Sequence, residues 1–306
     1  MPNAPAQFTE SPPGASGDGA SPEITAVLPA RNEAPGLNML LPRLKALLPE
    51  AELIVVDDGS TDETALVATR SGARCIRHPY SLGNGAAIKA GARAARGKTL
   101  IMLDADGQHD PDDIPRMLTR YAEGYAMVVG ARAPNTHASR WRRLANGIYN
   151  RFASYMVGQK IEDLTSGFRV VDAPTFRRFL YLLPNGFSYP TTSTMAFFRS
   201  GLPVAYVPVN ARQRVGRSHI RMLQDGLRFL LIILKVGTLF SPMRLFLPLS
   251  VGLFALASSY YAWTFFHYHQ FTNMSALLFT ASMLTFLFGI VSELVSSLHY
   301  RETDQR

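Results

Sequence analysis

The residues with the clearest chemical potential are two aspartates and a glutamine that follow one short apolar segment. Residues 99–102 read Thr-Leu-Ile-Met, and the chain continues as Leu103-Asp104-Ala105-Asp106-Gly107-Gln108-His109. Carboxylates at the end of an apolar strand lie at the carboxyl edge of a sheet, where open α/β sheets bind ligands. Carboxylate and amide oxygens suit a hard divalent cation, Mg²⁺ or Mn²⁺, that also binds phosphates and neutralises a diphosphate leaving group. The run therefore predicts a metal site at Asp104, Asp106 and Gln108; the alternative is an Asp-rich turn or helix cap.

Two further polar clusters follow predicted strands. They read Pro29-Ala30-Arg31-Asn32-Glu33 and Asp57-Asp58-Gly59-Ser60. Acidic side chains at strand ends commonly accept hydrogen bonds from ribose hydroxyls or base N–H groups. The segment 82–89 opens a helix with glycines, so its backbone can approach a ligand and Lys89 can reach a phosphate. It matches neither the P-loop nor the dinucleotide-binding fingerprint.

An alternation of strands and helices must position these clusters. The hydrophobic pattern predicts strands over 24–28, 53–56, 74–77, 99–103, 127–130 and 203–209. It predicts helices over 37–48, 62–71, 83–96, 140–158, 175–183 and 191–199, with one more opening at Asp110-Pro111. The segment 163–169 reads as a polar loop. The expected fold class is α/β, with a mostly parallel sheet and helices on both of its faces.

Charge and cysteine content limit the class of partner. The 306-residue chain carries a net charge of +8 and a single cysteine, Cys75, so no intrachain disulfide forms and a reducing compartment fits. Nucleic acid, anionic lipid or phosphorylated substrates would each explain the positive charge. Aromatic residues are not interleaved with the basic ones, which argues against nucleic acid, and the apolar C-terminal third favours the other two.

The N-terminal residues 1–22 are rich in Pro, Gly, Ser and Ala and have neither the basic region nor the apolar core of a signal peptide. They cannot bury enough apolar surface to order themselves, so we expect a flexible leader.

The segment 219–243 reads as an amphipathic helix at a membrane interface. Arg221, Arg228 and Lys235 are spaced by seven residues and share one face of a helix, opposite a leucine-rich face. The alternative is a buried helix whose basic side chains reach out to solvent.

Two longer apolar stretches, at about 245–266 and 275–298, are each long enough to cross a bilayer and predict a transmembrane hairpin over 244–299. Lys and Arg flank the pair but are absent from the connection 267–273. By the positive-inside rule, both termini of this multi-pass protein, including the tail 300–306, are therefore expected in the cytoplasm. Glu293 is an acid inside the second stretch. Two structural roles, an ion pair with Arg244 or a side chain that reaches up to the membrane surface, are favoured over a role in transport.

Together these motifs resemble a known family. The P-A-x-N-E cluster, D-D-G-S, the glycines before a helix and D-A-D-x-Q are similar to those of inverting family 2 glycosyltransferases of GT-A fold. Later segments, Gly130-Ala131-Arg132, Thr165-Ser166-Gly167-Phe168-Arg169 and Arg214-Val215-Gly216-Arg217-Ser218-His219, resemble those of the polyprenyl-phosphate glycosyltransferases. That group includes dolichyl-phosphate mannose synthases and undecaprenyl-phosphate hexose synthases.

The resemblance implies roles for individual residues. The metal ligands would be Asp104, Asp106 and Gln108. The nucleotide site would contain Pro29, Ala30, Asn32, Glu33, Asp57, Asp58, Lys89, Asp104 and Ala105. The acceptor phosphate would meet Arg132, Arg142, Arg143, Asn146, Ser166, Arg214 and Ser218. The catalytic residues would be Asp106, Arg132 and Arg169. The chain departs from its relatives at Asn146, where some have serine, and at His219, where most have lysine.

The implied activity is transfer of a hexose from a UDP- or GDP-sugar to a polyprenyl phosphate, with inversion, by a cytoplasmic domain over 23–218. The nucleophile is a phosphomonoester with a second pKa near ~6, so it is largely ionised at neutral pH and needs no strong general base. Arginines orient it without giving up a proton. The resemblance also implies a homo-oligomer, such as a tetramer, and a downstream flippase or transferase as a partner. Together with the single cysteine, it implies the inner (plasma) membrane of a bacterium as the location.

Two other functions are weighed against this one. A processive polysaccharide synthase would carry a Q-x-x-R-W motif and more spans than this chain offers. A membrane scaffold derived from a transferase would not need the intact residues Asp104, Asp106 and Gln108. The sequence does not identify the sugar, the nucleotide or the polyprenol length.

Overall fold

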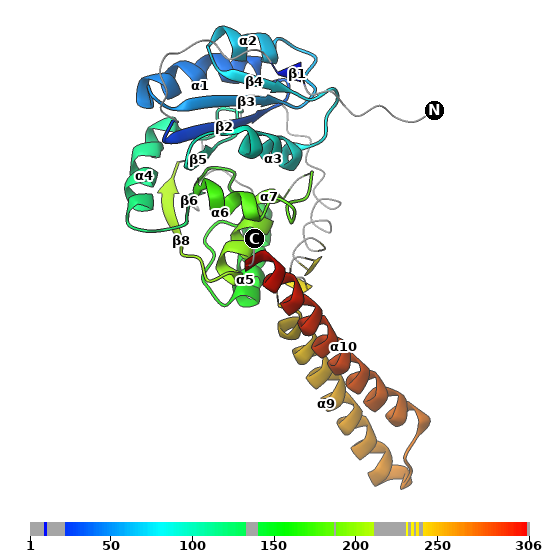
Figure 1. Ribbon diagram of the computed structural model, residues 1–306. Coiled ribbons are helices and arrows are strands. Elements are labelled where there is room, and N and C mark those ends of the chain that lie inside the picture. The colour runs from blue at the N-terminus through cyan, green and yellow to red at the C-terminus, as the bar shows by residue number, and fades with distance from the viewer. Residues whose placement is uncertain are drawn as a thin grey trace. The chain divides into compact units, whose positions relative to one another are not determined.

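The computed structural model describes residues 9–10, 22–132, 140–186, 188–210, 231, 234–235, 237–238 and 241–304. The chain divides into two compact units. The first comprises Met1–Asn150 with Ile161–Gly226, and the second comprises Arg151–Lys160 with Leu227–Arg306. The first unit contains the sheet, and the second contains two long C-terminal helices (Figure 1).

The sheet of the first unit has eight strands among the described residues, in the order β1-β4-β3-β2-β5-β7-β6-β8. Their bounds are β1 Thr9–Glu10, β2 Ile24–Ala30, β3 Glu52–Asp57, β4 Arg74–Arg77, β5 Thr99–Met102, β6 Met127–Arg132, β7 Arg169–Asp172 and β8 Val204–Val209. Strands β4, β3, β2 and β5 are parallel, and so are β6 and β8. The expected mostly parallel α/β sheet is thereby confirmed.

The prediction missed strand β7, which pairs antiparallel with both β5 and β6. This segment follows the polar run 163–168 and is only four residues long, so its period of two is hard to distinguish from a loop. The prediction of a wholly flexible leader is also wrong at one point, because Thr9 and Glu10 pair with β4. The rest of residues 1–21 lies outside the described residues.

The helices of the first unit are α1 Ala34–Leu47, α2 Thr64–Arg70, α3 Asn84–Ala94, α4 Ile114–Ala122, α6 Ala173–Arg178 and α7 Tyr189–Arg199. A single-turn 3₁₀ helix, η1 Pro111–Asp113, precedes α4, and α5 Arg140–Val157 passes from the first unit into the second. Helices α1, α2 and α4 share one core with alternate residues of the strands, whereas α3 packs on the other face, where Gly91 meets Val27 and Val56.

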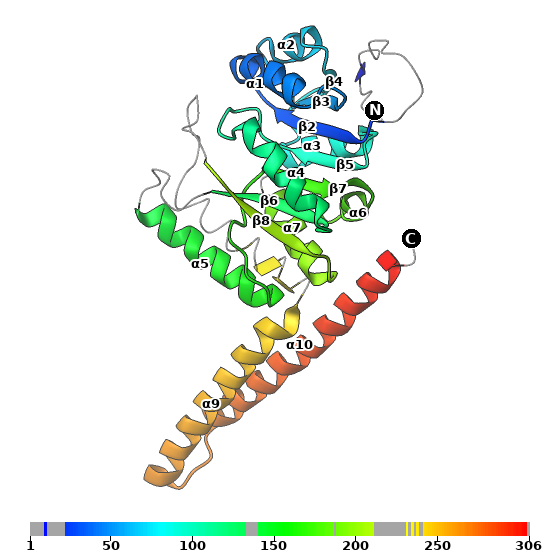
Figure 2. The ribbon, with the colours of Figure 1, turned by 90° about the vertical axis from the view of Figure 1, so that its left-hand side faces the viewer.

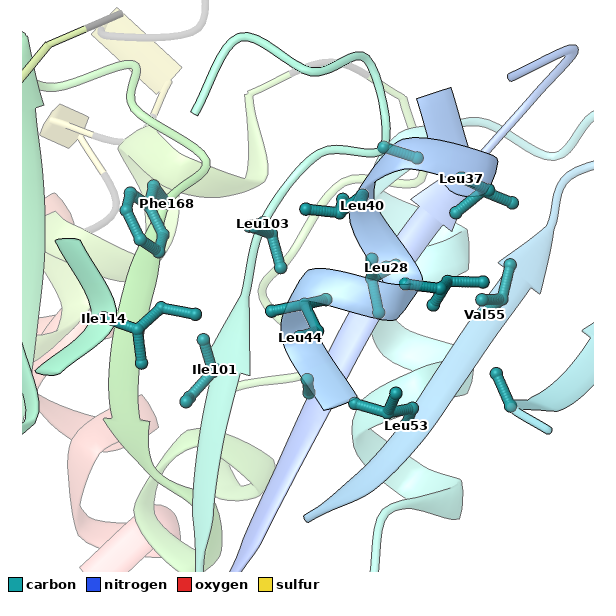
Figure 3. Close-up of a cluster of buried hydrophobic side chains, with 14 of the residues drawn as sticks. Leu28, Leu37, Leu40, Leu44, Leu53, Val55, Ile101, Leu103, Ile114 and Phe168 are labelled. Atoms are coloured by element: carbon teal, nitrogen blue, oxygen red, sulfur yellow. The ribbon is translucent and has the colours of Figure 1, made fainter. Parts of the chain in front are cut away.

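Leucines of α1 fill the first of these cores. Leu37, Leu40, Leu41 and Leu44 recur at spacings of three and four, which places them on one side of the helix. Figure 3 shows Leu37, Leu40 and Leu44 against Leu28, Leu53 and Val55 of the strands. Burying a leucine side chain contributes about 1.5–3 kcal/mol, so this face of α1 holds the helix against the sheet.

The second unit contains an antiparallel helix pair. Helices α9 Pro242–Tyr268 and α10 Asn273–Asp304 lie side by side along most of their lengths (Figure 2). Both are long and apolar enough to cross a membrane, over Pro242–Tyr268 and Asn273–Ser296. Only 11% and 17% of an apolar 18-residue stretch in each helix is buried. Such exposure distinguishes them from core helices of a soluble protein, and it leaves large side chains such as Phe254 and Phe288 facing outward.

Polar contacts join the two helices internally. Ser250 Oγ donates to the Ser282 carbonyl at 3.1 Å, and Ser282 Oγ donates to the Ser250 carbonyl at 2.9 Å. The Met243 amide of the first turn of α9 donates to Glu293 Oε2 at 3.2 Å. Glu293 therefore satisfies a backbone donor at the start of α9, where such donors lack partners within the helix.

The predicted Glu293–Arg244 ion pair is wrong. Arg244 Nη1 donates instead to the Tyr155 carbonyl at 2.6 Å, and the Tyr155 hydroxyl donates to the Arg244 carbonyl at 2.9 Å. An arginine placed near the last carbonyls of α5 is stabilised by the helix dipole, which explains its choice of partner. Most of the predicted interfacial helix over 219–243 lies outside the described residues.

Candidate functional site

Three parallel strands bring the polar clusters to one edge of the sheet. Strand β2 pairs with β3, with Ala30 opposite Asp57, and with β5, with Val27 opposite Met102. The strands run in the same direction, so the residues that follow each of them gather at the carboxyl edge. Pro29 and Ala30 are themselves buried within β2.

The loop after β2 is tied to the loop after β3. The Asn32 amide donates to Ser60 Oγ at 2.9 Å, and Asn32 Oδ1 accepts from the Thr61 amide at 2.9 Å. Asn32 has a φ of 55°, a left-handed conformation that asparagine tolerates better than most residues. The Glu33 amide donates to Thr64 Oγ1 at 3.0 Å. Asn32 is exposed and Glu33 is half-buried, so both remain at the surface of the site.

The two aspartates at the end of β3, Asp57 and Asp58, are buried in the protein. Asp57 Oδ1 accepts from the Ser60 amide at 2.8 Å, and its Oδ2 lies 3.3 Å from Arg77 Nε. Asp58 accepts hydrogen bonds at 2.7–2.9 Å from His78 Nδ1, Ser81 Oγ, and the amides of Leu82 and Gly83.

These contacts determine what Asp58 does. Burial alone would raise the pKa of its carboxyl, but the hydrogen bonds from His78 and the 81–83 segment outweigh burial and hold the pKa below its ordinary value. The charged carboxylate organises the segment from His78 to Gly83. Asp57 and Asp58 therefore shape the loops of the predicted nucleotide site, and their side chains are too buried to be its contact surface.

The glycine-containing start of α3 packs closely against another segment of the chain. A Cβ on Gly85 would lie 2.0 Å from the Pro184 carbonyl oxygen, and one on Gly83 would lie 2.5 Å from the Asn185 oxygen. The glycines make room for the chain's own segment 184–186, which accepts backbone hydrogen bonds from Gly85 and Ala86.

Lys89 belongs to the same packing arrangement. Its Nζ donates to the Leu183 carbonyl at 3.0 Å and also to Asn185 Oδ1. The contact of Lys89 with the nucleotide phosphates stays a prediction; in the structure its ammonium group joins α3 to a segment far away in the sequence. Burial and the nearby Arg93 lower its pKa.

The D-x-D-x-Q run forms a tight turn after β5. Asp106 Oδ1 accepts from the Gln108 amide at 3.1 Å, and Gly107 has a φ of 73°. Asp104 Oδ1 lies 3.5 Å from Asn84 Nδ2. Ala105 is buried, and its carbonyl comes so near Gly36 of α1 that a Cβ there would lie 2.1 Å away. The backbone of the turn is thus fixed by its packing against α1, while its polar side chains are partly exposed.

This turn fits a divalent cation that takes some of its ligands from the protein and the rest from a substrate. Asp104, Asp106 and Gln108 are all partly exposed, and they come from one turn. Within the described residues, no three His, Cys, Asp or Glu side chains cluster as a metal site, so the protein supplies only two carboxylates and an amide here. Mg²⁺ and similar cations are typically bound in this way, through one or two carboxylates together with substrate phosphates.

His109 follows the turn and is buried beneath it. Its ring lies 5.1 Å from the ring of Phe168. Burial, together with the positive charge of Arg132, lowers the pKa of His109 to about 4, against the opposing effect of Asp106 and Asp163. The imidazole is therefore neutral at neutral pH. The sequence showed His109 only as a neighbour of the turn.

Arg132 stands at the end of β6 with part of its side chain exposed. Its Nε lies 2.8 Å from Asp163 Oδ2 and its Nη2 lies 3.0 Å from Asp163 Oδ1. Burial alone would lower the pKa of Arg132, but Asp163, Asp104 and Asp106 outweigh it and raise the pKa. The predicted arginine thus lies within electrostatic reach of both aspartates of the turn.

Sequence reasoning missed Asp163. The sequence pattern predicts a polar loop over 163–169 and gives no role to its single acidic residue. The order Asp-Leu-Thr-Ser was the available signal, because an aspartate commonly accepts hydrogen bonds from amides two or three residues later.

Two other predictions about this loop are wrong. Arg169 is completely buried, and its guanidinium donates to the Ser166 carbonyl, Ser193 Oγ and Thr194 Oγ1 at 2.8–2.9 Å. Ser166 is also buried, and its Oγ accepts from the Phe168 amide at 3.3 Å. Neither side chain can reach a substrate, so both support the loop from inside. Burial lowers the pKa of Arg169.

The remaining predicted acceptor residues lie beyond what the structure describes. Arg142, Arg143 and Asn146 belong to α5, but their side chains are not described. Arg214 and Ser218 lie outside the described residues.

Comparison with known families matches both units. The profile of Glycosyl transferase family 2 matches residues 25–181, which is half of the chain, and that of the GtrB C-terminal hairpin matches residues 241–298.

Several curated proteins are similar in sequence. The undecaprenyl-phosphate 4-deoxy-4-formamido-L-arabinose transferase of Photorhabdus laumondii is 34% identical over 151 residues, 46% of each chain, so this chain spans about half of that relative's length. Glycosyltransferase AglJ of Haloferax volcanii is 28% identical over 81% of this chain and 86% of its own. The undecaprenyl-phosphate mannosyltransferase of Micrococcus luteus is 28% identical over 62% of this chain and 84% of its own.

Solved structures share the fold. Glucosyl-3-phosphoglycerate synthase from Mycobacterium tuberculosis, in complex with Mn²⁺ and UDP-glucose, superposes with a TM-score of 0.57 at 23% identity, covering 70% of this chain and 78% of that one. The same enzyme with phosphoglyceric acid gives a TM-score of 0.56 at 21% identity, covering 70% and 79%.

Proposed function

From the premise that this chain belongs to glycosyl transferase family 2, we propose that it transfers a hexose from a UDP- or GDP-sugar to a polyprenyl phosphate at a membrane surface. One observation carries the proposal. The D-x-D-x-Q turn follows β5 and Arg132 ends β6 at the same edge of the sheet, where Asp104 and Asp106 help to raise the pKa of Arg132, in a chain that also has an apolar helical hairpin. The names of the undecaprenyl-phosphate transferases among its relatives support the same acceptor.

The donor would bind along the loops after β2, β3 and β5. Asn32 and Glu33 offer polar groups at the surface of the site, on loops held in place by Asp57 and Asp58. Asp104, Asp106 and Gln108 would hold Mg²⁺ or Mn²⁺ against the donor diphosphate. The bound cation would neutralise the negative charge that develops on the departing nucleoside diphosphate.

The acceptor would bind at Arg132. A phosphomonoester oxygen attacks C1 of the sugar as the bond from C1 to the diphosphate oxygen breaks, and the nucleoside diphosphate leaves with the electron pair. The acceptor is already an anion at neutral pH, so the protein needs to position it rather than deprotonate it. Arg132 keeps its proton, which suits it to orient an anionic nucleophile without quenching it.

The hairpin would anchor the enzyme where such an acceptor is found. A polyprenyl phosphate keeps its phosphate at headgroup depth, so an enzyme held at the membrane surface meets it without extracting the lipid. The Lys and Arg residues on either side of the hairpin support a cytoplasmic location for both termini and for the first unit.

The test is transfer by the purified full-length protein in detergent. Radiolabelled UDP-glucose, UDP-galactose, UDP-GlcNAc, GDP-mannose and a nucleotide-linked 4-deoxy-4-formamido-L-arabinose are offered separately, with undecaprenyl phosphate as acceptor and Mg²⁺, Mn²⁺ or EDTA. We expect metal-dependent label in the lipid phase from one donor, which would identify the sugar.

The matched variant is Asp106→Asn, which keeps the size of the side chain and removes its charge. We expect it to lower transfer by about 10²- to 10³-fold, the usual loss when one electrostatic stabiliser is removed. Transfer that is unaffected by EDTA and by this substitution would contradict the proposed site. No transfer from any donor, with nucleotide binding intact, would favour another acceptor or a scaffold role.

A further inference from the structure

Asp163 is a buried carboxylate on which several donors of the site converge. Arg132 donates to it from its backbone amide, from Nε and from Nη2, at 2.8–3.2 Å. Thr165 donates from its amide and its hydroxyl at 3.0 and 3.2 Å, and the Ser166 amide donates at 3.1 Å. Both oxygens of the carboxylate are thereby used within the protein.

The geometry of the ion pair leaves one edge of the Arg132 guanidinium for a ligand. Asp163 takes the side formed by Nε and Nη2, and Thr165 Oγ1 also accepts from Nη2. Nη1 has no hydrogen-bond partner in the part of the chain that the structure describes. A planar guanidinium held along one edge by a bidentate carboxylate presents its remaining donors in a fixed direction.

The loop that Asp163 organises also touches the metal turn. Gly167 follows Thr165 and Ser166, and a Cβ added to it would lie 2.7 Å from Asp104 Oδ2. The loop whose amides donate to Asp163 thus continues directly into the residue that lies against Asp104. One short loop connects the arginine at the end of β6 to the first aspartate after β5.

We propose that Asp163 is a positioning residue, which holds the Arg132 guanidinium at a fixed place relative to Asp104 so that it can receive the acceptor phosphate. The inference rests on the function proposed above. It assigns the transfer reaction a residue that never contacts a substrate. A free arginine side chain loses rotamer entropy when it binds a phosphate, and one that is already held in place loses less. Asp163 should therefore lower the KM for the acceptor.

The experiment is a double-mutant cycle in the full-length protein, with separate Michaelis constants for the donor and for undecaprenyl phosphate. Asp163→Asn preserves the size of the side chain and removes its charge. We expect the KM for the lipid acceptor to rise about 10- to 100-fold, the usual cost of losing the partner that orients a ligating residue, while the KM for the donor is unchanged. If Asp163 acts through Arg132, the double variant Asp163→Asn/Arg132→Ala has the same acceptor KM and kcat as Arg132→Ala alone.

Glu52→Gln is the matched control for loss of a buried carboxylate. Glu52 accepts from Thr25 Oγ1, from the Arg96 amide and from Arg96 Nε at 2.8–2.9 Å, but it lies at the start of β3, at the opposite end of the strand from the site. We expect it to lower thermal stability and to leave the acceptor KM as in the wild type.

Two results would overturn the inference. One is an Asp163→Asn protein that loses stability like Glu52→Gln but keeps the wild-type KM for the acceptor. The other is an effect of Asp163→Asn that persists in full in the Arg132→Ala background. Should Asp163→Asn fail to fold, Thr165→Val removes the hydroxyl that contacts both partners and must raise the acceptor KM by itself. Wild-type turnover is the internal reference, since its absence would contradict the proposed function rather than the role of Asp163.

Discussion

At the scale of single residues, the site depends on which polar groups face the ligand and which face the protein. Asp104 and Asp106 remain partly exposed, whereas Asp57, Asp58 and Asp163 are buried and accept hydrogen bonds from the chain itself. All five are aspartates near strand ends or loops. The two groups are thus chemically identical but differently placed: Asp104 and Asp106 are accessible for the substrate contact proposed above, and the other three hold the loops in shape.

Gly167 provides a test of how closely the loop and the metal turn are packed. The substitution Gly167→Ala would place a methyl group 2.7 Å from Asp104 Oδ2 and 3.2 Å from the Tyr189 hydroxyl, both too near for an ordinary contact. We expect Asp104 to move, so that the concentration of Mn²⁺ needed for half-maximal transfer rises about tenfold or more, as for the loss of a residue that orients a metal ligand.

The control for this substitution is Gly186→Ala, because a Cβ at Gly186 would meet nothing within 4 Å. Titration of transfer activity with Mn²⁺ compares the two variants. An unchanged metal requirement in Gly167→Ala would show that Asp104 does not depend on the packing of this loop.

At the scale of secondary-structure elements, helix α1 supports the loop that would hold the nucleotide. Its apolar side is buried against β2 and β3, and its first turn comes within contact of the Ala105 carbonyl through Gly36. The position of α1 therefore influences both the loop after β2 and the turn after β5. Loss of packing along α1 should therefore lower the free energy of unfolding.

We expect Leu41→Ala to lower the free energy of unfolding by about 2–5 kcal/mol, the range for removing a leucine from a packed core. Leu41 is completely buried, whereas its neighbour in the same helix, Met39, is 55% exposed. Met39→Ala should therefore change stability by less than about 0.5 kcal/mol. Thermal unfolding of the two variants, followed by circular dichroism in the same detergent, makes the comparison. Equal losses would mean that α1 is not packed as described.

At the scale of the whole molecule, a family 2 catalytic unit is combined with an apolar hairpin. The hairpin satisfies its own polar groups, through the reciprocal Ser250–Ser282 hydrogen bonds and the contact of Glu293 with the Met243 amide. Buried polar groups in a membrane must find partners within the protein, because the hydrocarbon offers none. The outward side chains are large and apolar, as expected for contact with lipid.

The proposed topology predicts which parts of the chain are accessible from each side of the membrane. In a Cys75→Ser background, Gln270→Cys in the connection between α9 and α10 should react with a membrane-impermeant maleimide in intact cells. Thr303→Cys, near the C-terminus, should react only after the membrane is permeabilised. Cys75 itself would add little maleimide labelling, because burial raises the pKa of its thiol to about 11. Labelling of Thr303→Cys in intact cells would contradict a cytoplasmic C-terminus.

The amino-acid sequence by itself determined the α/β class, the two apolar helices and the placement of the D-x-D-x-Q run after a buried strand. Each of these is a local signal: a hydrophobic period of two or 3.6 residues, a long apolar stretch, or polar residues at the end of a strand. The family resemblance, which rests on the same local motifs, was confirmed by the comparisons.

Only the tertiary structure decided which partner each polar side chain takes. Lys89 binds Asn185, Arg169 is enclosed by Ser193 and Thr194, and Arg132 pairs with Asp163, all across 24 to 96 residues of sequence. A charged side chain shows the same residue type in the sequence whether it meets a ligand or a distant carbonyl. Its role depends on what the fold brings within hydrogen-bond distance, and no local pattern records that.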